Sequence, residues 1–414
     1  MPRIANARYQ ANGTRFRLYP QPKVLEGFEE PQIVYVNSPP GSIKAGPEDD
    51  ILRVIDAVDK VPYNESGEWP PYTGPRHEAA AEPGPDGHFD RIRPGTRAFS
   101  AAAMFATVRF TLDVWERYFG RKLGWYFRDA YPRLELIPRV ETDNAWSRFG
   151  YLECGFPEYP DDRDNPYAEN FDVVAHEIGH CMLREVIGNP MHRNVIGTPF
   201  RTMPVEFRAH DEAAADLVAL VASLHFDTVV EALLRATRGN LFSGNVLTRI
   251  GELSKQREEI RIAFNNQKMS NVKWHADPVE YKYRLSEPFT GGAFDVLVEI
   301  YLRNLIEREV LPEKLVKRTL ARAHRHDRAG RAEIAAVYEA NEKQFAAALV
   351  DARDYFGRML AWAWTRTSLD NVSFPGVVDN LVKADQELGT GKHRNAIRRS
   401  FEWRQILPRE RAAR

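Results

Sequence analysis

The sequence predicts an α+β protein in which a mixed α/β half precedes an α-helical half. Short runs rich in β-branched and aromatic residues, which are typical of strands, occur up to residue 156. Beyond residue 170 the apolar residues recur mainly at helical spacing, and the chain is expected to be largely helical to its end. The change from one pattern to the other lies close to residue 190.

The first 95 residues are expected to form a segment of their own. Residues 32–36 (QIVYV) predict a strand, and residues 50–60 predict a helix. Residues 62–94 are rich in proline and glycine, which predicts a loop over the surface.

Regular structure resumes in residues 96–190, which we expect to form an α/β half. Residues 98–119 predict a helix with a large apolar face, and residues 134–137 predict a strand. Residues 148–156 predict a further strand, placed at a sheet edge because Gly150 and Gly155 interrupt it.

Two helices follow, and they carry the chemistry discussed below. The first is expected over residues 170–186, since residues 188–190 (Gly-Asn-Pro) are helix stop signals. The second is expected over residues 205–225, inside an α-helical half that comprises residues 191–414.

Composition excludes several classes of function. Lysine plus arginine (57) nearly balances aspartate plus glutamate (58), which argues against a nucleic-acid partner. The sequence has no run of 18 or more apolar residues, so no membrane-spanning helix is expected. The N-terminus lacks the apolar core of a signal peptide. Two cysteines are too few for a disulfide framework in 414 residues. A cytoplasmic protein without a membrane partner is therefore expected.

The most informative stretch is His176-Glu177-Ile178-Gly179-His180, an H-E-x-x-H pattern on the first of these helices. Side chains four residues apart lie on one helix face, so both imidazoles can reach one metal ion. Glu177 lies beside them, where its carboxylate can take a proton from a metal-bound water. This arrangement is typical of zinc hydrolases.

A catalytic zinc site needs a third protein ligand, and the second helix offers candidates. Glu212 and Asp216 are four residues apart on one face. With Glu212 on the zinc, Asp216 is placed to accept the second ring N–H of a ligand histidine, and Asp211 could serve the other histidine. Asp211 or His210 as the third ligand is the alternative assignment.

The two helices together resemble those of the thermolysin-like metallopeptidases, the gluzincins, whose pattern is H-E-x-x-H followed by E-x-x-x-D. Residues 172–180 (DVVAHEIGH) are similar to that family's zinc helix, and residues 144–146 (NAW) to its Asn-Ala-aromatic element. Residues 288–294 (PFTGGAF) occupy the place of the family's glycine-containing turn into a helix. The resemblance spans roughly residues 98–407, and residues 303–350 would be an inserted helical pair.

The resemblance implies a thermolysin-like fold, with an active-site cleft between the α/β half and the helical half. It implies zinc (Zn2+) held by His176, His180 and Glu212, with Glu177 as general base and then proton donor to the leaving amine. Asn144 and Ala145 would lead into an edge strand, residues 150–155, that binds a peptide or protein substrate by β-augmentation.

The sequence departs from the family at the groups that stabilise the oxyanion. The family has a tyrosine between its zinc helices, and no tyrosine lies between His180 and Glu212 here. In place of the family's histidine before the glycine-containing turn, Tyr283 or Arg284 is the candidate donor, with His275 more distant.

The sequence thus predicts a zinc metallopeptidase, and we expect an endopeptidase rather than an exopeptidase. Two alternatives stay open. One is a zinc-containing protein with reduced or lost catalysis that acts as a binding module. The other is a peptidase restricted to one specific substrate.

Overall fold

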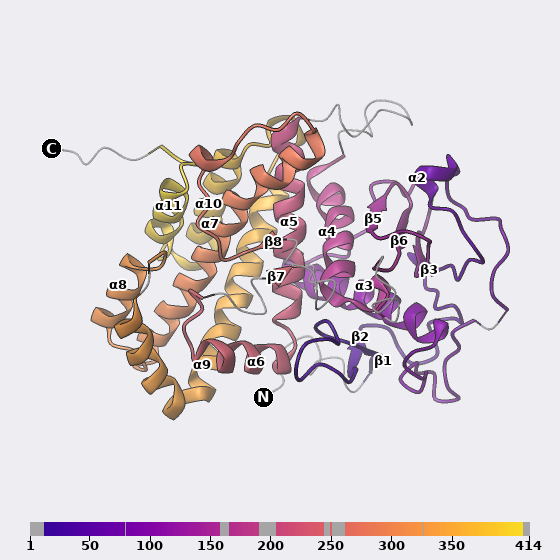
Figure 1. The fold of residues 1–414 in the computed structure, drawn as a ribbon, viewed down its shortest axis with the longest axis horizontal. Coiled ribbons are helices and arrows are strands. Elements are labelled where there is room, and N and C mark those ends of the chain that lie inside the picture. Colours follow the sequence, from indigo (N-terminus) through magenta and orange to yellow (C-terminus); the bar gives the residue numbers. More distant parts are fainter. Residues whose placement is uncertain are drawn as a thin grey trace. The chain divides into compact units, whose positions relative to one another are not determined.

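The computed structural model describes residues 12–78, 80–157, 165–189, 204–243, 249–250, 261–325 and 327–408 (Figure 1). It contains both helices and small sheets, so the α+β class predicted from the sequence is confirmed. The chain forms two compact units, which we describe one at a time. Unit 1 is Met1–Glu185, Val218–His225 and Gly251–Ile260, and unit 2 is Val186–Leu217, Phe226–Ile250 and Arg261–Arg414.

The described residues of unit 1 form two sheets. Strands β1 (Thr14–Leu18) and β2 (Gln32–Val36) form an antiparallel pair. The second sheet has the order β3-β4-β6-β5, with β3 parallel to β4, β4 parallel to β6 and β6 antiparallel to β5. Its strands are, in that order, Leu52–Val54, Leu134–Ile137, Tyr151–Cys154 and Ala145–Arg148.

Helix α3 (Arg97–Phe119) is the central element of unit 1. It begins after Thr96, whose side chain accepts a hydrogen bond from the N–H of Phe99, and it ends at Gly120, whose φ of 67° is left-handed. The side chains from Phe99 to Glu116 are all buried, because α3 packs against β1, β2, β3 and β4. A helix covered on all sides is buried core.

Two predictions for unit 1 are corrected by the structure. The helix expected over residues 50–60 is absent from that described stretch, which instead holds β3, because Leu52 and Val54 are buried in alternation. The strand expected over residues 148–156 is a hairpin of β5 and β6, which turns at Gly150 with a φ of 92°. The short helix α2 (Tyr63–Ser66) lies in the proline-rich region predicted to be loop.

Unit 2 is built mainly of helices that pack against one another. Helix α7 contacts α8, α9 and α11, and α9 also contacts α6 and α10 (Figure 1). Their bounds, with those of the short elements around them, are α6 (Asp227–Thr237), β7 (Arg249–Ile250), β8 (Arg261–Ile262), α7 (Pro278–Glu307), α8 (Glu313–Ala321), α9 (Arg328–Thr365), α10 (Phe374–Gly389) and α11 (Arg394–Trp403).

The glycine-containing turn expected at residues 288–294 is not a turn. These residues, Pro288 included, lie inside the continuous helix α7. A Cβ on Gly291 would lie 2.4 Å from Arg404 Nη1, and one on Gly292 would lie 2.7 Å from the Phe401 ring. Both glycines therefore serve the close approach of another segment rather than a change in backbone direction.

Candidate metal centre

Helix α4 (Phe171–Ile187) carries the H-E-x-x-H pattern. His176 and His180 are four residues apart, and their ring centroids lie 4.7 Å apart with the rings nearly perpendicular. Both imidazoles are buried, with 5% and 6% of their residue surface exposed. The spacing thus brings the two histidines together on one helix face, as the sequence predicts.

Helix α5 (Val205–Ser223) carries Glu212, which is also buried. One ligand atom from each of His176, His180 and Glu212 lies within 4.8 Å of the other two. No second group of three such side chains able to hold a metal occurs in the described part of the chain. The group contains the two histidines and the third ligand that the sequence favoured.

The alternative third ligands occupy other surroundings on α5. The His210 ring is fully buried and lies edge-to-face against Phe289, with their centroids 5.3 Å apart. Burial lowers the pKa of His210 to about 4, and the charge of Asp211 offsets this only in part. Asp211 and Asp216 are themselves buried. Their roles beside the ligand histidines stay predictions.

Glu177 lies on α4 between the two histidines, with 9% of its surface exposed. Its backbone carbonyl accepts a hydrogen bond of 2.7 Å from the Ser147 hydroxyl, which fastens strand β5 to the helix. Burial raises the pKa of the Cys154 thiol well above its usual value, and the negative charge of Glu177 adds to this effect. The two cysteines are buried and reduced, as expected of small apolar residues.

The edge strand beside this helix is β5, not the strand predicted over residues 150–155. Strand β6, which occupies that stretch, lies between β4 and β5, so its backbone groups are used on both sides. Strand β5 ends the sheet and begins at Ala145. The Asn144 side chain accepts a hydrogen bond of 2.8 Å from the Ala145 N–H, which shapes the entry into this strand.

Sequence reasoning missed Lys282, which lies on α7. Its ammonium donates a hydrogen bond to Oε1 of Glu212, and the two side chains are 9% and 3% exposed. Burial is the largest single influence and lowers the pKa of Lys282, but the charge and hydrogen bond of Glu212, with the charges of Tyr283 and Asp211, together raise the pKa overall. The overlooked signal is that Lys282 shares a helix face with Leu285 and Phe289, both buried.

The donors proposed for the oxyanion lie close to Lys282 in sequence. Arg284 is 40% exposed at its side chain, and its Nε donates to Glu280 one helical turn earlier at 3.0 Å. The Tyr283 ring lies 4.4 Å from the Lys282 ammonium. His275 precedes α7 and accepts a hydrogen bond of 3.1 Å from a backbone N–H two residues on. The sequence-based roles of these three residues stay predictions.

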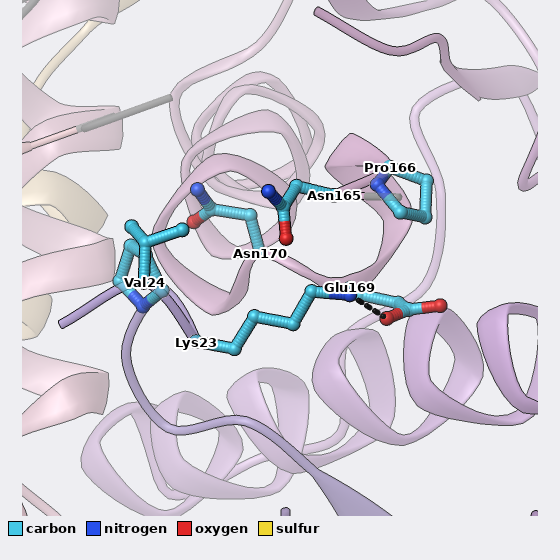
Figure 2. Close-up of a pocket in the computed structure, with 7 residues that line it drawn as sticks. Lys23, Val24, Asn165, Pro166, Glu169 and Asn170 are labelled. Atoms are coloured by element: carbon cyan, nitrogen blue, oxygen red, sulfur yellow. Dashed lines mark hydrogen bonds and ion pairs between the residues drawn. The ribbon is translucent and has the colours of Figure 1, made fainter. Parts of the chain in front are cut away.

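A small pocket lies where the chain enters α4 and contains none of the candidate ligands. Figure 2 shows Lys23 reaching across it to Glu169, with their charged atoms 3.4 Å apart. The other lining residues are Pro22, Val24, Asn165, Pro166 and Asn170. The polar groups that line this pocket are the Lys23–Glu169 ion pair and two asparagines. They include no nucleophile and no complete set of metal ligands.

The donor atoms fit zinc. Two imidazoles and one carboxylate are a ligand set that zinc takes in catalytic sites, where one position stays open for water. All three side chains are buried.

Comparison of the chain with known protein families and with characterised proteins found no match. No single helix in the described ranges is long and apolar enough to cross a membrane, although α5 and α6 together pass that test as a bent pair.

Proposed function

We propose that this protein is a zinc-dependent metallopeptidase of the thermolysin-like type, which hydrolyses peptide bonds. The observation that carries the proposal is the group of His176, His180 and Glu212 with Glu177 on the same helix as the histidines. Helices α4 and α5 thereby supply three metal ligands and a general base. Among the described residues, no other group of side chains supplies both a metal ligand set and a general base.

In this proposal His176, His180 and Glu212 hold the zinc. When bound, zinc polarises the scissile carbonyl and lowers the pKa of a bound water. Glu177 accepts a proton from the attacking water as its oxygen bonds to the carbonyl carbon. The same carboxyl group then gives the proton to the leaving amine as the C–N bond breaks.

Strand β5 would bind the substrate by β-augmentation. It ends its sheet and is fastened to α4 through Ser147 and the Glu177 carbonyl. An extended peptide added to this edge would run beside the general base. Asn144 and Ala145, where the strand begins, would contact the substrate backbone.

The decisive experiment compares the wild type with Glu177→Gln. Both should contain about one zinc per chain by elemental analysis, because the ligands are unchanged. Against a broad peptide library followed by mass spectrometry, the variant should lose about 100-fold to 10,000-fold in rate, the usual contribution of a general base. A zinc-free wild type, or equal hydrolysis by both proteins, contradicts the proposal.

The absence of a tyrosine between His180 and Glu212 favours a second candidate, a zinc-containing protein that binds a partner without catalysis. The same experiment separates the two. Zinc in both proteins with hydrolysis in neither supports the binding module. Cleavage of a single sequence in the library supports a peptidase restricted to one substrate.

A further inference from the structure

We propose that Lys282 is a positioning residue of the metal centre, which fixes the Glu212 carboxylate through one oxygen and weakens the hold of the centre on its metal. The inference rests on the proposed function, because it assumes that Glu212 is a ligand. It assigns a role to a side chain on a third helix, α7.

The contact that carries the inference is a buried ion pair. The Lys282 ammonium binds Oε1 of Glu212, and both side chains are almost fully removed from solvent. A lysine ammonium is a compact point charge that seldom lies buried without a function or a partner. Here its partner is one of only three side chains that form the candidate ligand group.

The geometry favours a one-oxygen ligand. With Oε1 bound by the ammonium, Oε2 is the oxygen left for a metal. Hydrogen bonds to the second oxygen of a ligating carboxylate orient that ligand and fix how many positions it occupies. A carboxylate that occupies one position leaves room for water and for the substrate carbonyl.

The charges determine the sign of the effect on affinity. Within the ligand group the Lys282 ammonium offsets the charge of Glu212, the one carboxylate among the three side chains. A divalent ion is repelled by the ammonium twice as strongly as a unit charge at the same distance would be, and burial reduces screening. We take this repulsion to exceed the roughly 10-fold to 100-fold in affinity that an orienting partner supplies. The centre thus keeps positive charge available to a developing oxyanion.

The test is the zinc dissociation constant of the full chain, measured by competition with a chromophoric chelator. Lys282→Met should bind zinc at least about tenfold more tightly than the wild type, because the repulsion is gone. Lys282→Arg keeps the charge and should stay within about threefold. Lys268→Met is the matched control: this lysine lies over the Trp403 ring, 4.3 Å from its centroid, and the affinity should not change.

A lysine with a purely structural role gives the opposite result, since its loss would disorder Glu212 and weaken binding. Equal or weaker zinc binding by Lys282→Met therefore overturns the inference while the proposed function stands. A wild type that binds no zinc overturns both.

Cobalt substitution provides a second readout that does not depend on affinity. Without the ammonium, both oxygens of Glu212 can bind, and the visible absorption of Co2+ in Lys282→Met should fall as the coordination number rises. If Lys282→Met folds only in the presence of metal, the variant is refolded in Co2+ for this measurement. A spectrum identical to that of the wild type contradicts the one-oxygen role.

Discussion

Unit 1 and unit 2 each contain a buried lysine–glutamate pair, and the two pairs have different surroundings. In unit 1, Lys60 binds Glu153, with side-chain exposures of 2% and 0%. Glu153 also accepts hydrogen bonds from the backbone N–H of Tyr63, at 3.1 Å, and from the Trp146 indole, at 3.0 Å. In unit 2, Lys282 binds Glu212, which is also one of the three side chains of the candidate ligand group with His176 and His180.

The difference lies in the donors and acceptors around each carboxylate. Donors of hydrogen bonds surround Glu153, so its charge is satisfied by Lys60 before α2, by the first N–H of α2 and by the Trp146 indole of β5. The imidazole nitrogens near Glu212 can act as metal ligands instead, and two of them with a carboxylate make a zinc ligand set. Burial and pairing alone therefore do not distinguish a structural glutamate from a candidate ligand.

The largest effect on stability is expected for Lys60→Met. The substitution leaves the Glu153 carboxylate buried without its cation, which costs about 3–5 kcal/mol in unfolding free energy. Urea denaturation should show this loss, while the zinc affinity of the folded protein stays within about twofold. The exposed pair of Lys317 and Glu313 supplies the control, since solvent screens this pair and Lys317→Met should cost far less than Lys60→Met. Equal costs for the two variants would mean that the buried pair contributes no more than a surface pair.

The next largest effect is a difference in zinc affinity between variants of the two glutamates. Glu212→Gln should weaken zinc binding by more than about 100-fold, because the loss of a ligand exceeds the loss of an orienting partner. Glu153→Gln should leave the zinc affinity within about twofold. Both dissociation constants come from chelator competition at neutral pH. Similar losses in the two variants would remove Glu212 from the ligand set.

Much of the candidate site was predictable because its pattern is local. The helix period fixes His176 and His180 on one face, and the same period links Glu212 to Asp216. The helix bounds also agree within a few residues, since Gly188 and the stop signals after it are sequence features. Local periodicity predicts which residues lie on one face of a helix, but it does not predict which other segment packs against that face.

The parts that escaped prediction are long-range. Lys282 lies 70 residues from Glu212, and no periodicity connects them. The order β3-β4-β6-β5 depends on pairings between distant segments, so β6 was mistaken for the edge strand. Gly291 and Gly292 suggested a turn, although the tight contacts of Arg404 and Phe401 are the reason for them.

The smallest effect is expected at the bond that joins β5 to α4. Ser147→Ala removes the buried donor to the Glu177 carbonyl and should cost about 1–2 kcal/mol, because the acceptor loses its partner. Ser42, an exposed serine whose hydroxyl donates to the Pro39 carbonyl at 2.6 Å, is the control, and Ser42→Ala should cost less than about 0.5 kcal/mol. Urea midpoints measure both. Zinc affinity should be unchanged in Ser147→Ala, because the bond involves the backbone of Glu177 and no ligand. A loss of zinc with little loss of stability would show instead that β5 holds the ligand helix in place. The zinc affinity would then depend on this strand as well as on Glu212.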